Sequence, residues 1–399
     1  MTDTLTTPSA VPARASARTA QVFVSDPEAV TTIRQALGNL NLADADFVSG
    51  NVTTATERMS RQPSPRLLIV DISGVDNPVH AINALADVCE PNTGVIVIGD
   101  RNDIVLYRDL KQAGVFEYFF KPLVGTLVTS ACGAVLTGNV ESRAPTRTGK
   151  VVFVLGVRGG VGATTIAVNT AWYLAAARQR WVMLLDLDMQ KGDAALQLDA
   201  SPSHALREAF EHPERVDKLF IERAAIHVDQ RIDMLASLEA IGHTVDIDDD
   251  AFGSLLDKLL TRYRFIFVDA PPTVAMRLSQ SLQMPSTCVL VGNGTLASAR
   301  DVARWRAWIG PNTPDRTTIH VLNQHGAPGG LPDAEFARAA GRAPDVVIPY
   351  DKDISIANAL GIKSAPQGTT LKRSLAPLLR HLSGETTAPQ RSLLRRILG

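Results

Sequence analysis

The fold of this 399-residue chain is decided by the stretch GVRGGVGATT at residues 156–165. An apolar run, KVVFVL at 150–155, precedes it, and a helix-favouring run, IAVNTAWYLAAARQR at 166–180, follows it. Glycines between a strand and a helix let backbone N–H groups turn toward an anion, and the helix N-terminus adds the positive end of its dipole. The stretch therefore predicts a phosphate-binding loop, with the hydroxyl of Thr164 placed to bind Mg²⁺.

Two positions of this loop depart from the general pattern G-x-x-x-x-G-K-[S/T]. Val157 stands at the first glycine, and Ala163 stands where a lysine normally reaches the β- and γ-phosphates. The loop by itself therefore leaves its assignment open, and the polar residues that follow the other apolar runs decide it.

Carboxylates follow two further apolar runs of the same region. WVMLL at 181–185 leads into Asp186 and Asp188, and FIFV at 265–268 leads into Asp269. The carboxyl ends of parallel strands meet at one edge of a sheet, where a metal and an attacking water would lie. A single aspartate there is usually only a strand cap, but three in register with a glycine-rich turn indicate a site. Two later runs, 319–322 and 346–348, end in Asn323 and in Pro349-Tyr350-Asp351.

This series resembles the MinD/ParA family of P-loop ATPases over residues 150–382. That family carries a deviant loop, K-G-G-x-G-K-[T/S], whose first lysine reaches across a nucleotide-sandwich dimer; the resemblance implies ATP and Mg²⁺ as ligands and a homodimer. Arg158 replaces the first lysine and keeps its charge, whereas Ala163 replaces the second and loses it. Since charge stabilisation of the transferring phosphate is usually the largest catalytic term, we expect hydrolysis to suffer far more than binding.

The resemblance also assigns a role to each matching residue. Asp188 positions the catalytic water, if the chain is active. Mg²⁺ is held directly or through water by Thr164, Asp186 and Asp269. The nucleotide-binding residues are Arg158, Gly159, Gly160, Val161, Gly162, Ala163, Thr164, Thr165, Asn323, Pro349 and Asp351.

A second α/β pattern occupies residues 20–135. Apolar runs at 21–26, 66–71, 95–100 and 117–122 alternate with helical patterns, which predicts another parallel, doubly wound sheet. The polar residues at the strand ends resemble a response-regulator receiver domain, with a pocket formed by Asp26, Asp71 and Lys121. That family has an acidic pair where this chain has Ser25-Asp26, and a hydroxyl where it has Gly99. Two interpretations stay open: phosphorylation of Asp71, or a receiver-shaped docking module.

The predicted fold class is therefore α/β, with two doubly wound parallel-sheet domains. The N-terminal one is receiver-like (flavodoxin-like), and the C-terminal one, at 150–382, is a deviant-Walker P-loop NTPase unit of MinD/ParA type. Residues 1–19 are expected to be a disordered leader, 136–149 a linker, and 383–399 a linker with a short amphipathic tail. A net charge of −1 gives no general attraction to nucleic acid. The three cysteines, which follow no metal-ligand spacing, predict buried reduced thiols.

The tail, RSLLRRILG at 391–399, places its apolar side chains on one helix face and Arg391 and Arg395 on another. This pattern suits contact with an anionic membrane surface, and a frayed end or a partner-docking helix are its alternatives. The contact residues are Leu393, Leu394, Ile397 and Leu398.

A receiver-like unit fused to a G-G-V-G-A-T-T loop looks like the CpaE/TadZ family, assembly and localisation proteins of Flp (tight adherence) pili. The resemblance implies a cytoplasmic, ATP-binding scaffold at the inner face of the membrane or at the cell pole, which recruits the pilus secretion machinery and binds no nucleic acid. The alternative is an active ParA/MinD-like positioning or partitioning ATPase. A third interpretation is a phosphorelay output protein switched through Asp71.

Overall fold

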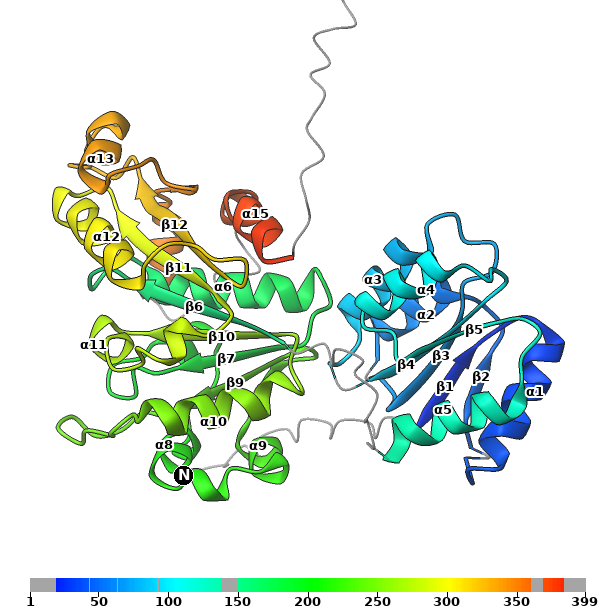
Figure 1. Cartoon of the computed structure of the whole chain (residues 1–399). Helices are drawn as coiled ribbons and strands as arrows, with labels where there is room; N and C mark the ends of the chain where they lie inside the picture. Colours follow the sequence, from blue (N-terminus) through cyan, green and yellow to red (C-terminus); the bar gives the residue numbers. More distant parts are fainter. Residues whose placement is uncertain are drawn as a thin grey trace, which may run out of the picture. The chain divides into compact units, whose positions relative to one another are not determined.

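The computed structural model describes residues 19–42, 44–62, 64–91, 93–137, 149–359 and 369–383. The chain divides into two units, Met1–Arg147 and Thr148–Gly399, which we describe separately. Both units are α/β, as the sequence predicts (Figure 1). The four apolar tail residues lie outside the described residues, as do nearly all of the expected leader and linker.

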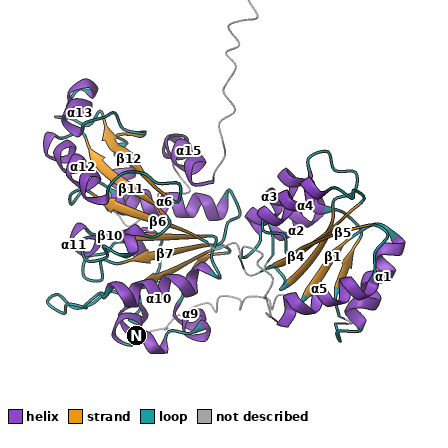
Figure 2. Cartoon of the chain, in the orientation of Figure 1, coloured by secondary structure: helices purple, strands orange, loops and turns teal. Residues whose placement is uncertain are grey.

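The first unit is a five-stranded parallel sheet in the order β2-β1-β3-β4-β5 (Figure 2). Helices α1 and α5 cover one face, and α2, α3 and α4 cover the other. The strands are β1 (Ala20–Phe23), β2 (Asp46–Val48), β3 (Leu67–Asp71), β4 (Gly94–Gly99) and β5 (Glu117–Phe120). The helices are α1 (Pro27–Gly38), α2 (Val52–Met59), α3 (Pro78–Val88), α4 (Ile104–Gln112) and α5 (Gly125–Thr137).

Short polar side chains start the helices of this unit. Asp26, Asn51, Asn77 and Asp103 stand at the N-caps of α1 to α4, and each accepts a hydrogen bond from a backbone N–H of the first turn. Such caps satisfy N–H groups that have no partner within the helix. The cap at Asp26 has a second consequence, because it places this carboxylate at the carboxyl end of β1.

The second unit is an eight-stranded sheet in the order β13-β12-β11-β6-β10-β7-β9-β8. All neighbouring strands are parallel except β8 and β9, which pair antiparallel. The strands are β6 (Lys150–Gly156), β7 (Val182–Asp186), β8 (Ile226–Asp229), β9 (Ile232–Ala236), β10 (Phe265–Ala270), β11 (Ser286–Asn293), β12 (Arg316–His325) and β13 (Val346–Pro349).

Helices cover both faces of this sheet. Helices α6, α7 and α15 pack on one face, and α8 to α13 pack on the other. The α-helices are α6 (Ala163–Ala176), α7 (Ala194–Gln197), α8 (Ala205–Glu211), α9 (Lys218–Ala224), α10 (Asp249–Leu260), α11 (Pro272–Ala275), α12 (Leu296–Ile309), α13 (Asp333–Ala340), α14 (Lys352–Ala359) and α15 (Thr369–Ser383).

Strand β6 shows why the predicted strands read as unbroken apolar runs. Val151, Phe153 and Leu155 point into the core on one face of the sheet, and Val152 and Val154 point into the core on the other. Since successive strand side chains alternate between faces, a strand covered on both sides has no position left for a polar residue. The interior positions of β6 are therefore all apolar.

The cysteines agree with the expectation from the sequence: Cys89, Cys132 and Cys288 are buried thiols, none in a disulfide. Within the described residues, we find no helix with both the length and the apolar composition that spanning a bilayer requires.

One buried histidine makes the second unit sensitive to acid. The His320 side chain on β12 stacks on Phe336 with ring centroids 5.7 Å apart, and neither ring nitrogen has a hydrogen-bond partner among the described residues. Burial lowers the pKa of His320 from 6.5 to about 4. The unfolded chain therefore binds a proton in this pH range that the folded chain does not, and stability is lost as the pH falls from about 6.5 toward about 4.

We expect His320→Leu to remove this part of the acid sensitivity. Between pH 7.5 and pH 5 the variant should lose about 2 kcal/mol less unfolding free energy than the wild type. Urea unfolding followed by tryptophan fluorescence measures it, because all four tryptophans lie in the second unit. His381→Leu, at an exposed position of α15, is the control and should follow the wild type. Equal losses in all three proteins would contradict the assignment.

Candidate functional site

The glycine-rich loop joins the end of β6 to the start of α6. Gly160 and Gly162 adopt left-handed backbone angles, with φ of 77° and 85°. Gly162 is the N-cap of α6, so it brings no side chain to cap the first turn. The first N–H groups of a helix have no partner within the helix and attract anions. The loop thus has the backbone conformation of a phosphate cradle.

Two side chains from the end of β12 hold this loop in place. Asn323 donates from Nδ2 to the carbonyl of Val161 at 2.9 Å, and Gln324 lies 3.5 Å from the carbonyl of Gly160. A Cβ atom on Gly162 would lie 2.4 Å from Asn323 Nδ2, so this position admits only glycine in the present geometry. Asn323 therefore lies where the sequence predicts, and its observed contact is with the loop backbone.

A small cavity of about 50 Å³ opens beside the loop. The loop and α6 supply Gly162, Thr165 and Ile166 to its lining. The ends of β12 and β13, the residues after β13, and helices α14 and α15 supply the rest. The predicted residues Asn323, Pro349 and Asp351 all line this cavity.

Asp186 and Asp269 lie side by side below the loop. They end the neighbouring parallel strands β7 and β10, and they are paired in register. Both are buried, and the side chain of Asp269 is hydrogen-bonded to Thr164. Asp186 accepts from the backbone N–H of Asp188 at 3.1 Å and of Ala194 at 3.3 Å. The three residues predicted to bind a metal are thus brought to one place.

Burial and mutual repulsion disfavour the ionised forms of these two carboxyl groups. Burial, with the charges of Asp188 and Asp193 adding to it, raises the pKa of Asp186 to about 7. Burial and the charge of Asp186 also raise the pKa of Asp269 well above its usual range. A divalent cation reverses such shifts because it favours the ionised form. Two carboxylates and a hydroxyl are oxygen ligands that suit Mg²⁺, which keeps waters and phosphate oxygens in its remaining positions.

The described residues contain no group of three or more His, Cys, Asp or Glu arranged around one metal position. A Mg²⁺ bound by Asp186 and Asp269 would therefore take its other ligands from the Thr164 hydroxyl and from water or phosphate oxygens. The loop after β7 closes over the carboxylates, because a Cβ on Gly192 would lie 2.3 Å from Asp186 Oδ2. Asp188, half-buried at the start of this loop, accepts from the backbone N–H of Lys191 at 3.0 Å.

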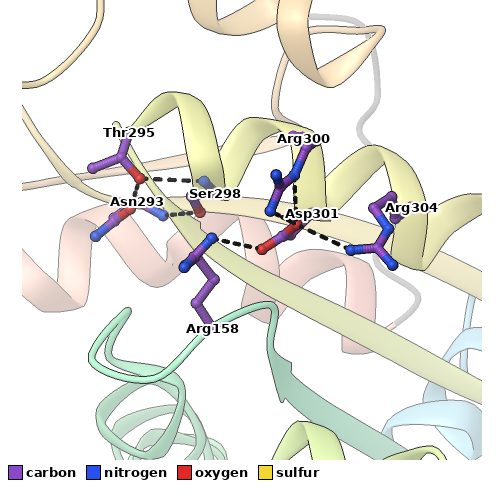
Figure 3. A network of polar contacts seen from close by, with 7 residues as sticks. All are labelled: Arg158, Asn293, Thr295, Ser298, Arg300, Asp301 and Arg304. Carbon is purple, nitrogen blue, oxygen red and sulfur yellow. Dashed lines mark hydrogen bonds and ion pairs between the residues drawn. The ribbon is translucent and has the colours of Figure 1, made fainter.

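Arg158 takes a direction that the sequence does not reveal. Its guanidinium donates to Asp301 Oδ2 on α12 at 2.9 Å, so it points from the loop to this helix (Figure 3). Ala163 provides no charge at the other position where the resembled family has a lysine. Asp301, a partner 143 residues away in the sequence, was missed by sequence reasoning, since nothing in the local pattern marks it.

The predicted pocket of the first unit is also assembled. Lys121 Nζ lies 2.6 Å from Asp71 Oδ2 and 3.4 Å from Asp26 Oδ2. Burial lowers the pKa of Lys121, but its hydrogen bond to Asp71 and the charges of the two carboxylates outweigh this, so the pKa is raised.

The neighbouring position differs from a phosphorylation switch. A Cβ on Gly99 would lie 2.6 Å from the hydroxyl oxygen of Tyr118, which itself donates to the carbonyl of Arg101 at 2.7 Å. The space that a serine or threonine side chain would need at position 99 is therefore filled.

The clamp on the loop can be tested at Gly162. We expect Gly162→Ala to destabilise the second unit by about 1–3 kcal/mol more than Gly242→Ala, because only the former adds a clash to the left-handed backbone cost. Gly242 has a similar φ of 94° and nothing within 4 Å of a built Cβ. Urea unfolding followed by tryptophan fluorescence gives both values. Equal destabilisation would show that Asn323 moves aside without cost.

One family of known proteins matches part of the second unit. Residues 149–298 match the family described as "AAA domain". A virulence plasmid ParA family protein, pGP5-D of Chlamydia psittaci, is 27% identical over 143 residues, which are 34% of this chain and 52% of that protein. The chain thus spans about half the length of the curated relative that it matches.

Two solved structures are similar to this chain. A pilus assembly protein CpaE from Caulobacter crescentus CB15 is 35% identical and covers 29% of this chain and 96% of its own, with a TM-score of 0.27. A ParA family ATPase from Chlorobium tepidum TLS covers 59% of this chain and 99% of its own, with 21% identity and a TM-score of 0.52. The second unit of this chain has the α/β fold of that ParA family ATPase.

Proposed function

We propose that this chain is a dimeric, ATP-binding scaffold of ParA/MinD type with weak or absent hydrolysis. One observation carries the proposal: a phosphate cradle and an oxygen ligand set for Mg²⁺ are assembled around Thr164, Asp186 and Asp269, while the loop ends in Ala163. Binding needs the cradle and the metal. Fast phosphoryl transfer also needs positive charge on the transferring group.

Each predicted residue has a place in this proposal. Mg²⁺ would be held by Thr164, Asp186 and Asp269, directly or through water, and would neutralise charge on the phosphates and on the two buried carboxylates. Asp188 would position a water if hydrolysis occurs. The phosphates would contact the backbone of 159–165, and the base would lie against Asn323, Pro349 and Asp351.

The cellular part of the proposal is assembly and localisation of Flp (tight adherence) pili. It rests on the resemblance to CpaE/TadZ proteins, which combine a receiver-like unit with this variant of the loop, and on the name of the Caulobacter crescentus match. The chain would act in the cytoplasm, at the inner face of the membrane or at a cell pole, and recruit the pilus secretion machinery. Membrane contact would use the tail, whose residues lie outside those described.

The first unit would serve as a docking module in this scheme. Asp71 is already ion-paired with Lys121, and Tyr118 fills the space beside Gly99 where a switch hydroxyl would stand. The contact at Gly99 favours docking over phosphorylation, whereas the ion pair of Lys121 with Asp71 fits both interpretations of this unit.

An active partitioning or positioning ATPase is the competing function. It would require rapid hydrolysis and, for a DNA cargo, a basic surface. Ala163 and the net charge of −1 favour the scaffold instead.

Nucleotide binding is tested by calorimetric titration of the full chain with Mg-ATP. We expect saturable binding that Asp269→Asn weakens roughly tenfold or more, because the variant keeps the shape but loses a charge at the metal. Asp257→Asn, on the exposed side of α10, is the control and should bind like the wild type. Absence of binding up to millimolar Mg-ATP would overturn the proposal.

The missing lysine can be restored. We expect Ala163→Lys to raise the rate of ATP hydrolysis roughly tenfold or more over the wild type, since it returns a positive charge to the transferring phosphate. Ala163→Met adds a side chain of similar length without charge and should leave the rate unchanged. Phosphate release assays give the three rates. Rapid hydrolysis by the wild type would instead favour the competing ATPase function.

A further inference from the structure

Helix α12 presents an excess of positive charge beside the phosphate loop. Its fourteen residues contain Arg300, Arg304 and Arg306 against one acidic residue, Asp301, for a net charge of +2. Asp301 accepts from Arg158 at 2.9 Å and from Arg300 at 3.0 Å, and Arg304 lies 3.7 Å away (Figure 3). One carboxylate thus faces three guanidinium groups. The side chains of Arg300 and Arg304 remain 64% and 75% exposed.

An apolar cavity of about 380 Å³ adjoins this charge cluster. Trp305 and Trp308 form one side of it, with ring centroids 5.3 Å apart and planes nearly perpendicular. Pro272 and Met276, from the segment after β10, also line it. Met276 is 55% exposed and Trp308 is 46% exposed, so these large side chains do not serve only to fill the core.

We infer that this α12 surface, made of Arg300, Arg304, Trp305, Trp308 and Met276, binds an acidic amphipathic segment of a partner protein. An apolar side chain of that segment enters the cavity between the tryptophans and Met276. Its carboxylates pair with Arg300 and Arg304, which Asp301 leaves incompletely neutralised. Tryptophan and arginine next to a pocket are the side chains that contribute most to binding at protein interfaces.

The charge of the surface distinguishes between occupants. A two-fold symmetric contact between two copies would bring two helices of charge +2 against each other, which is unfavourable. A nucleic acid would meet Asp301 in the middle of the cluster and an apolar cavity beside it, which offers little to a phosphate backbone. An acidic segment with an exposed apolar side chain complements both parts of the surface.

The surface does not depend on nucleotide for its construction, so this inference goes beyond the proposed function and can fail separately from it. It nevertheless adjoins the loop, because Val157 lines the cavity and Arg158 bonds Asp301.

The test starts from a phage-displayed library of random 16-residue peptides. They are selected on the full chain without nucleotide and counter-selected on the Arg300→Glu/Arg304→Glu variant. We expect enrichment of peptides that carry at least two acidic residues around an aromatic or branched apolar residue. Synthetic copies should bind the wild type, measured by fluorescence anisotropy, and bind the double variant and Trp308→Ala roughly tenfold or more weakly.

Two controls separate a direct contact from a folding defect. Arg215→Glu, an exposed arginine elsewhere in the second unit, should bind within about twofold of the wild type. A peptide with its glutamates replaced by lysines should prefer the double variant to the wild type, which an unfolded protein cannot reproduce.

Enrichment of neutral or basic peptides, or equal binding by all variants, would overturn the inference. It would fail equally if the α12 substitutions changed only the binding of a double-stranded DNA oligonucleotide, or only the dimer mass by light scattering. Those outcomes would assign the surface to nucleic acid or to self-association. Loss of Mg-ATP binding with retained peptide binding would leave the inference about the α12 surface intact.

Discussion

The second unit is arranged around two buried carboxylates of like charge. Asp186 and Asp269 end adjacent strands in register, away from the water that would otherwise solvate them. Asp186 accepts hydrogen bonds from the backbone N–H groups of Asp188 and Ala194, and Asp269 is hydrogen-bonded to the Thr164 side chain. The chain also passes close to Asp186 at position 192. These contacts supply donors and space but no positive charge. Burial and mutual repulsion therefore raise the pKa of both carboxyl groups.

The cationic side chains near this loop are distributed unusually for the resembled family. Arg158 is directed to Asp301 on α12, and Ala163 carries no charge. A phosphate in the loop of this conformation would therefore meet backbone N–H groups and Mg²⁺ before any basic side chain. This distribution of charge is the reason for proposing that the site holds a nucleotide and transfers its phosphate slowly or not at all. The same geometry places the guanidinium of Arg158 against Asp301, beside the proposed partner surface.

Sequence reasoning succeeded where a continuous apolar run ended in a polar residue. It found β6, β7, β10, β12 and β13, and with them Asp186 and Asp269, because long apolar runs mark strands that are buried on both faces. It missed β2, β8 and β9, which are three to five residues long, and β11, whose run ends without a carboxylate. The contacts of Arg158 with Asp301 and of Tyr118 with the space at Gly99 could not be predicted. Both are decided by how separate elements pack, and no local pattern encodes that.

The filled space beside Gly99 has a consequence for the history and engineering of the first unit. A hydroxyl-bearing side chain at position 99 would collide with Tyr118, and a smaller residue at 118 alone would leave a hole beside a buried strand. Each of these two substitutions is therefore unfavourable by itself, and only the double substitution avoids both the collision and the hole. The two positions are therefore coupled, and a hydroxyl-bearing residue at position 99 requires a simultaneous substitution of Tyr118.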